Sequence, residues 1–263
     1  MSVHGFLKTS TVDYPGLLSS VLFMSGCNFD CAYCYNGELK DQFDLNRKEF
    51  DQSKSLKQNI QECDNRSERI IEEFLLHLEE RKNMIQGVVI TGGEPLIRDN
   101  FDIIVQLLKR IKDMGYKIKI DTNGSYNDNL KKLIETGYLD YVAMDIKGPF
   151  YKYFYIVHPE RIFISSNEIG NNINISKSID IIMSSGIDYE FRTTCVKGIH
   201  EQMDFLEMGA VIQGAKNYYL QNYSTNDNIG STLGYKSFTR EELEVFKDTI
   251  SPFVEHVEIR GLK

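Results

Sequence analysis

Length, composition and charge exclude several classes of protein. The chain has 263 residues, 41% of them hydrophobic and 26% charged, which is ordinary for a water-soluble globular protein. Its net charge of −8 argues against broad contact with a nucleic-acid backbone, so no nucleic-acid partner is expected. No signal-peptide pattern and no apolar run of about 20 residues is present, so we expect a cytoplasmic protein without membrane contact.

Strand-like and helix-like segments alternate along the chain. Short apolar or β-branched runs predict strands, and apolar residues spaced three or four apart predict amphipathic helices. Strands are expected at Leu18–Met24, Val88–Thr91, Lys117–Asp121, Tyr141–Asp145, Tyr189–Val196 and Tyr218–Tyr223. Helices are expected at Ile70–Leu78, Ile103–Ile111 and Ile179–Met183, the last closed by Gly186.

This order of elements predicts an α/β fold with a mainly parallel sheet. Strands that are apolar along most of their length are typical of a parallel sheet covered by helices. Repeated β–α units with right-handed crossovers build an open or closed barrel. We expect a single domain over residues 1–263, in which segments 39–66 and 150–177 are insertions or loops.

Three cysteines, Cys27, Cys31 and Cys34, follow the first predicted strand. A total of five cysteines without a secretion signal does not fit a disulfide framework, so the trio predicts a metal or cluster site. Three thiolates can bind three irons of a [4Fe–4S] cluster and leave the fourth iron open. A structural zinc site is the alternative, although no fourth Cys or His lies at zinc-finger spacing. Cys63 and Cys195 are interpreted as free structural thiols.

Polar residues stand at the ends of the later strands. The second strand ends in Gly92-Gly93-Glu94, where glycines let the backbone approach a ligand and Glu94 offers a carboxylate to an amino group. Because the carboxyl ends of barrel strands gather at one mouth, the polar side chains there are expected to orient a zwitterionic cofactor. Surface charges that merely flank the strands are the alternative. The residues concerned are Asp121, Asp145, Lys147, Arg192 and Gln221.

The C-x3-C-x2-C spacing, with Tyr33 just before the third cysteine, resembles the hallmark of the radical SAM superfamily. The resemblance implies a partial (β/α)6 barrel of the radical SAM type, mainly a parallel sheet with helices outside. It also implies that Cys27, Cys31 and Cys34 hold a [4Fe–4S] cluster whose open iron binds S-adenosyl-L-methionine. One electron would then cleave this cofactor, and the resulting 5′-deoxyadenosyl radical would abstract a hydrogen atom.

Longer segments resemble glycyl-radical enzyme activating enzymes, related to pyruvate formate-lyase activating enzyme, and most of all the activating proteins of anaerobic ribonucleoside-triphosphate reductase. In that group the radical takes a hydrogen from a backbone glycine of a partner enzyme. The implied partners are an anaerobic ribonucleotide reductase and a flavodoxin or ferredoxin-type electron donor. The similar segments are GFLKTSTVDYPGLLSSVLFMSGCNFDCAYCYN, ITGGEP, KIDTNG, YLDYVAMDIKGP and SGIDYEFRTTCV.

The resemblance extends to single positions. Lys147 matches a contact to the cofactor carboxylate, and Gly92–Glu94 matches the binding site of its methionine amino group. Tyr35 departs from the group, where His is usual, but Tyr can still place a ring near the cluster edge. A monovalent-cation site of the pyruvate formate-lyase relative matches Asp121, Thr122 and Asp145.

Two other functions remain open. A radical SAM enzyme acting on a small molecule, such as 7-carboxy-7-deazaguanine synthase, shares a reduced barrel but predicts a closed pocket with further polar groups, which the sequence does not show. A cluster-carrying electron-transfer protein would leave GGEP and the polar strand ends unexplained. The activase is therefore the preferred hypothesis, and it assigns no catalytic role to a side chain of this protein.

Overall fold

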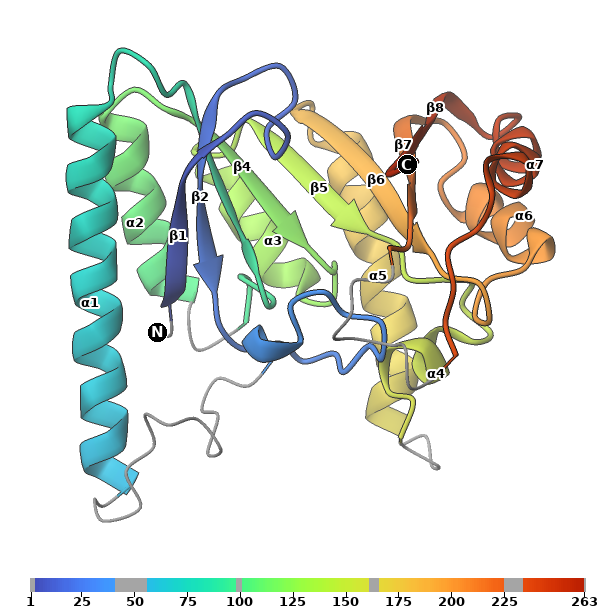
Figure 1. The fold of residues 1–263 in the computed structure, drawn as a ribbon, viewed down its shortest axis with the longest axis horizontal. Coiled ribbons are helices and arrows are strands. Elements are labelled where there is room, and N and C mark those ends of the chain that lie inside the picture. Colours follow the sequence, from blue (N-terminus) through green and yellow to red (C-terminus); the bar gives the residue numbers. More distant parts are fainter. Residues whose placement is uncertain (1–2, 41–55, 98–100, 161–165, 225–233, 263) are drawn as a thin grey trace. The chain divides into compact units, whose positions relative to one another are not determined.

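The structure is a computed structural model that describes residues 3–40, 56–97, 101–160, 166–224 and 234–262 (Figure 1). The chain divides into two compact units. The first comprises residues 1–28, 38–121 and 132–141, and the second comprises residues 29–37, 122–131 and 142–263.

The first unit contains four strands that follow one another in the sheet as they do in the chain. Strand β1 pairs antiparallel with β2, whereas β2–β3 and β3–β4 are parallel. The 3-10 turn η1 and the helices α1 and α2 lie in the connections. Bounds are β1 Val3–Ser10, β2 Ser19–Met24, η1 Gly37–Leu39, α1 Leu56–Glu80, β3 Gly87–Gly92, α2 Phe101–Asp113 and β4 Lys117–Thr122.

The core of this unit explains why its strands are apolar throughout. Val88, Val89 and Ile90 are all fully buried, so both faces of β3 are covered, as in a parallel sheet packed against helices. Helix α2 buries the apolar face that its spacing predicts, while its Ile103 remains exposed. Burial of such apolar side chains stabilises each by about 1.5–3 kcal/mol.

The second unit also carries four strands in chain order, β5 to β8, and the pairs β6–β7 and β7–β8 are parallel. Helix α7 begins with a capping box, in which the Thr239 hydroxyl accepts from the N–H of Glu242 and the Glu242 carboxylate accepts from the N–H of Thr239. Helix α3, Asn127–Glu135, is divided between the units after Lys131. The other bounds are β5 Tyr141–Asp145, α4 Tyr153–Val157, α5 Ser166–Ser184, β6 Asp188–Cys195, α6 Gln202–Val211, β7 Ala215–Asn222, α7 Arg240–Ile250 and β8 Val254–Arg260.

All six predicted strands are present, within three residues at each end. The sequence did not predict β1, β8, α3, α6 or α7. The two segments expected to be insertions or loops contain helix, because α1 begins at Leu56 in the first, and in the second α4 lies wholly and α5 partly. Residues 41–55 and 161–165 of those segments lie outside the described residues. None of the described helices has the length and apolar character needed to cross a membrane.

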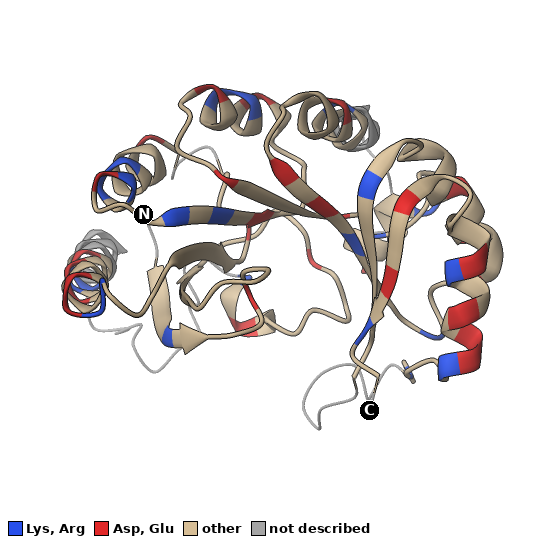
Figure 2. Cartoon of the chain, turned by 90° about the horizontal axis from the view of Figure 1, so that it is seen from above, with Lys and Arg blue, Asp and Glu red and all other residues tan. Residues whose placement is uncertain are grey.

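Charged residues lie on strands as well as on helices, as Figure 2 shows. Several of these strand charges are buried: Lys119 on β4 and Glu190 on β6 each have 1% of their surface exposed. Ionised side chains are almost never fully buried unless they are paired. The strand charges therefore direct attention to the pairs that they form.

Candidate active site

The loop that carries the first cysteine begins where β2 ends, in the first unit. The N–H of Gly26 donates to the carbonyl of Leu39 at 2.7 Å, and the N–H of Cys27 donates to the carbonyl of Lys40 at 2.8 Å. Cys27 is partly exposed and forms no disulfide with the described cysteines. Backbone hydrogen bonds therefore fix the position of this cysteine at the start of the loop.

The two glycines after β3 pack against the end of β2. The N–H of Gly93 donates to the carbonyl of Met24, and a Cβ on Gly93 would lie 2.0 Å from the carbonyl oxygen of Gly26. Gly92 has φ +114, and a Cβ there would lie 2.4 Å from the carbonyl oxygen of Met24. The sequence predicted a close backbone approach to a ligand at these glycines. The structure shows a close approach between the two strand ends, which by itself requires glycine at both positions.

The carboxylate of Glu94 is fully buried and accepts a hydrogen bond from the N–H of Leu96 at 3.0 Å. The N–H of Glu94 donates to the carbonyl of Gly26 at 2.7 Å. Glu94 therefore closes the turn that follows β3 and holds it against the cysteine loop. Its contact with a cofactor amino group stays a prediction.

Asp121, the residue before the end of β4, is in contact with a buried lysine that the sequence pattern did not predict as part of the site. The ammonium of Lys119 lies 2.5 Å from Oδ1 of Asp121, and the hydroxyl of Thr91 on β3 donates to Oδ2 at 3.1 Å. Residues two apart on a strand share a face, so the spacing of Lys119 and Asp121 was the available signal. Thr122, 2% exposed, accepts a hydrogen bond from the N–H of Gly124.

Cys31 and Cys34 lie in the second unit, in a turn where the N–H of Cys34 donates to the carbonyl of Cys31 at 3.2 Å. Cys31 is buried and Cys34 is partly exposed, and neither forms a disulfide with the described cysteines. Between them, Tyr33 is 3% exposed, and its hydroxyl has no hydrogen-bond partner among the described residues. Burial, followed by the neighbouring Cys31, raises the pKa of Tyr33 well above its usual value, so the hydroxyl keeps its proton.

A group of paired charges forms at the end of β5. Lys147 donates to Oδ2 of Asp145 at 2.7 Å, and Nε of Arg192 on β6 donates to Oδ1 at 2.5 Å. Burial acts to raise the pKa of Asp145, but the charges of Arg192 and Lys147 outweigh it and hold that pKa well below its usual range. Burial likewise opposes the charge of Lys147, yet Asp145 keeps its pKa well above the usual value.

A buried histidine fixes the backbone of this group. The N–H of Val196 donates to Nδ1 of His200 at 3.0 Å, so the proton of the neutral ring is on Nε2, which donates to the carbonyl of Lys147 at 2.9 Å. Burial lowers the pKa of His200 to about 4. The ring is therefore neutral near pH 7 and acts as a hydrogen-bond bridge from the end of β6 to Lys147.

The charged group continues onto β8. Arg260 binds both carboxylate oxygens of buried Glu190 at 3.2 Å, and its guanidinium lies 3.2 Å from the centre of the Tyr219 ring. NH1 of Arg192 lies 3.8 Å from Glu190. Gln221 of β7 is in register with Arg260 and makes no side-chain hydrogen bond to the described residues. Three cations (Lys147, Arg192, Arg260) thus lie in contact with two carboxylates, those of Asp145 and Glu190.

Tyr35, which replaces the usual histidine, packs against the segment after β7. Its ring stacks on Tyr223 with centroids 5.6 Å apart, and its hydroxyl accepts from the N–H of Ser224 at 2.5 Å. Tyr35 is still 46% exposed. Its position therefore joins the cysteine turn to the end of β7.

The structure divides the three cysteines between the units, with Cys27 in the first and Cys31 and Cys34 in the second. Within the described part of the chain, no three His, Cys, Asp or Glu side chains are placed as a metal-binding group. The donor set itself fits an iron–sulfur cluster, since thiolates are its usual ligands and the three cysteines form no disulfide with the described residues. The unpartnered hydroxyl of Tyr33 beside them is a second feature that fits a bound group.

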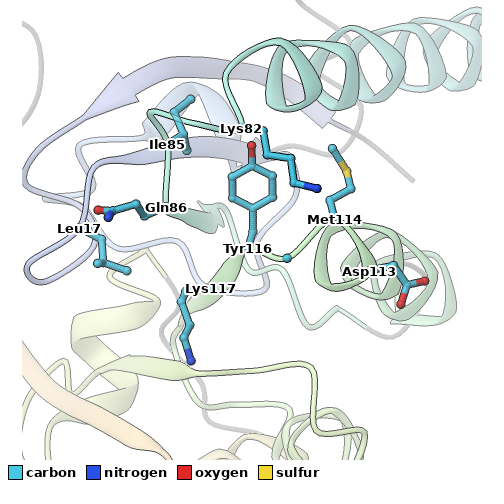
Figure 3. Close-up of a pocket in the computed structure, with 9 residues that line it drawn as sticks. Leu17, Lys82, Ile85, Gln86, Asp113, Met114, Tyr116 and Lys117 are labelled. Atoms are coloured by element: carbon cyan, nitrogen blue, oxygen red, sulfur yellow. The ribbon is translucent and has the colours of Figure 1, made fainter.

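A surface pocket lies in the first unit (Figure 3). It opens at the amino ends of β3 and β4, whereas Gly92 and Asp121 stand at the carboxyl ends of the same strands. None of the predicted site residues lines it, so it is not part of the candidate site. Its lining residues are Leu17, Lys82, Ile85, Gln86, Asp113, Met114, Gly115, Tyr116 and Lys117.

Comparison with known families matches residues 21–203 to the radical SAM superfamily. The chain belongs to this superfamily. Its fold is also shared with the solved structure described as native anSMEcpe with bound AdoMet, with a TM-score of 0.51 and 14% identity over 90% of this chain and 61% of that one. These comparisons confirm the fold class expected from the sequence, which is the α/β partial barrel of radical SAM enzymes.

Two relatives are similar in sequence to this radical SAM protein. MJ1227 of Methanocaldococcus jannaschii, which bears the provisional name glycyl-radical enzyme activating enzyme, is 27% identical over 99% of this chain and 96% of its own length. The 7-carboxy-7-deazaguanine synthase of Methanopyrus kandleri is 27% identical over 48% of this chain and 47% of its own length. The similarity to MJ1227 therefore extends over the whole chain, and that to the synthase over about half.

Proposed function

We propose that this radical SAM enzyme is an activase: it reductively cleaves S-adenosylmethionine at a [4Fe–4S] cluster and abstracts a hydrogen from a glycine of a partner enzyme. The observation that carries the proposal is the 27% identity to MJ1227 along nearly the full length of both chains. Similarity of this extent includes the regions beyond the cysteine motif, where a protein partner would be recognised.

Cys27, Cys31 and Cys34 would hold the cluster, which when bound supplies the electron for cleavage of the sulfonium bond. The backbone bonds of Gly26 and Cys27 fix the start of the loop, and Tyr33 fills the turn between the other two cysteines. Tyr35 holds the end of this turn on the segment after β7 through its stacking on Tyr223. The chain thus provides the ligands and their support.

The cofactor is a zwitterion at its methionine end, and the polar strand ends would bind it. The excess positive charge around Lys147 and Arg192 suits the carboxylate. Because Asp145 stays ionised at every physiological pH, it keeps both cations in place rather than competing for a proton. The Gly92–Glu94 turn would bind the amino group, and Gln221 has hydrogen-bonding capacity left for the cofactor.

The partner we propose is an anaerobic ribonucleoside-triphosphate reductase, with a flavodoxin or ferredoxin-type protein as electron donor. The segments that resemble its activating proteins, from the GFLKTSTVDYPG start to SGIDYEFRTTCV, support this choice.

Anaerobic reconstitution tests the proposal. We expect about four irons per chain, and formation of 5′-deoxyadenosine and methionine on reduction with S-adenosylmethionine. Addition of an anaerobic ribonucleotide reductase should then give a carbon-centred radical in electron paramagnetic resonance. Cys31→Ala should abolish the cluster, while Cys195→Ala, which removes a buried thiol outside the motif, should retain it. A cluster retained in Cys31→Ala would contradict the ligand assignment.

A small-molecule reaction is the second candidate function, favoured by the similarity to 7-carboxy-7-deazaguanine synthase over about half of this chain. The two functions differ in what stimulates turnover. A glycyl-radical protein should increase 5′-deoxyadenosine formation if the activase is correct. If a low-molecular-weight extract increases 5′-deoxyadenosine formation and the glycyl-radical protein does not, the small-molecule enzyme is favoured.

A further inference from the structure

The two carboxylates expected beside a monovalent cation already have cations of the protein bound to them. In the first unit, Oδ1 of Asp121 contacts the ammonium of Lys119. In the second unit, Asp145 contacts Lys147 through one oxygen and Arg192 through the other. Each observation holds within its own unit. A Na⁺ or K⁺ ion at either carboxylate would face a fixed positive charge.

Lys119 is the decisive residue, because a lysine that is buried within a strand requires an opposite charge to compensate its own. Its side chain is 2% exposed, and the only hydrogen bond that its ammonium makes with the described residues goes to Asp121. Removing an ammonium from water is costly unless an opposite charge compensates it. Asp121 provides that charge, so the pair is neutral before any ion arrives.

The remaining contacts of Asp121 and Thr122 fit the same conclusion. The second carboxylate oxygen of Asp121 accepts from the hydroxyl of Thr91 at 3.1 Å. The hydroxyl oxygen of Thr122 accepts from the N–H of Gly124 at 3.1 Å. Each of these two oxygen atoms already accepts a hydrogen bond from the protein, so an alkali ion would have to share it with that donor.

We propose that Lys119 is a built-in counter-cation for Asp121 and takes the place of a monovalent metal ion. Cofactor binding by this chain then requires neither Na⁺ nor K⁺. The part of this statement that concerns the cofactor rests on the proposed function, whereas the part that concerns Lys119 and Asp121 rests on their contact alone.

The test compares KCl and NaCl with N-methyl-D-glucamine chloride at equal ionic strength. In the reconstituted full chain, the Kd for S-adenosylmethionine should be the same in all three salts. In Lys119→Met the Kd should rise about tenfold in N-methyl-D-glucamine and recover in KCl or NaCl, a coupling typical of two linked ligands. Lys119→Arg should behave as the wild type.

A second readout needs neither cluster nor cofactor. The thermal midpoint of the cluster-free wild type should not differ between KCl and N-methyl-D-glucamine, while that of Lys119→Met should rise in KCl. Lys112→Met is the control, since it removes one lysine of the same unit from Asp140 but leaves Lys117 paired with that carboxylate, and it should show no such dependence. This readout stays valid even if 5′-deoxyadenosine is never formed.

The proposal would be overturned if the Kd or the thermal midpoint of the wild type depended on the cation. It would also be overturned if Lys119→Met folded but had the same Kd and midpoint in KCl and in N-methyl-D-glucamine chloride. If Lys119→Met does not fold in any salt, Lys119→Met combined with Asp121→Asn removes both charges and should fold without responding to KCl. A response of that double variant would place a cation site elsewhere and contradict the role of Lys119.

Discussion

Replacement of Asp145 by Asn tests whether the charge group at the end of β5 stabilises the fold. The carboxylate contacts Lys147 at 2.7 Å and Arg192 at 2.5 Å, and the three side chains are 25%, 16% and 14% exposed. Loss of one partner of a buried pair costs about 3–5 kcal/mol because the remaining charges stay desolvated. With this partial exposure we expect a loss of about 2–3 kcal/mol in the free energy of unfolding.

The assay is thermal and urea unfolding of the cluster-free chain, followed by circular dichroism. For a chain of this size the loss corresponds to a thermal midpoint lower by about 5–10 °C. Glu72→Gln is the matched control, since it breaks an exposed pair with Arg110, and little change is expected. A loss below about 1 kcal/mol in Asp145→Asn, the range of surface pairs, would refute the reasoning.

The pH dependence follows from the same pair. The folded-state pKa of Asp145 is below its ordinary value of 3.8, so the stabilisation is present above that value and is lost as the pH falls below it. The difference in stability between wild type and Asp145→Asn should therefore be constant from pH 7 to about pH 5 and shrink at lower pH.

Two further predictions concern His200 and Tyr33. The folded-state pKa of His200 is about 4, against 6.5 in water, so the free energy of unfolding should fall by about 3 kcal/mol as the pH drops from 6.5 to 4. Urea unfolding of His200→Gln at several pH values should show no such fall. The same pH dependence in His200→Gln would mean that another group causes it. Tyr33→Phe removes a buried hydroxyl without a partner, so the cluster-free chain should gain about 1 kcal/mol in unfolding free energy. A destabilised Tyr33→Phe chain would show that the hydroxyl is satisfied.

The parts of the fold that sequence could predict are those with a strong apolar pattern. Strand β3 is apolar at every central position, and α2 repeats its apolar residues at helical spacing. Strand β8 lacked such a pattern because it buries only Val254 and Val257 and keeps charged residues between them. Helix α6 begins with a capping box made by Glu201 and Asp204, an arrangement that the usual Ser/Thr signal does not reveal.

The candidate site could be predicted in its residue types but not in its pairings. The cysteine spacing and the superfamily were readable because they depend on neighbours in the chain. The contact of Asp145 with Arg192 joins residues 47 positions apart, and only the fold determines it. Glu190 was passed over because a glutamate in a strand is usually exposed, whereas here Arg260 compensates its burial. Lys119 was likewise not predicted, because a lysine in a strand is usually exposed, whereas here Asp121 compensates its burial.

The two backbone bonds at the base of the cysteine loop have a consequence for iron uptake. Gly26 and Cys27 are joined to Leu39 and Lys40, so the segment between them is a closed ring of fewer than fifteen residues, with Cys31 and Cys34 inside it. Thiols confined to so short a ring have an effective concentration of about a millimolar or more around one another. In the proposed cluster, an iron atom bound by one thiol would therefore meet the next by local motion of the ring, and cluster assembly would be an intramolecular step.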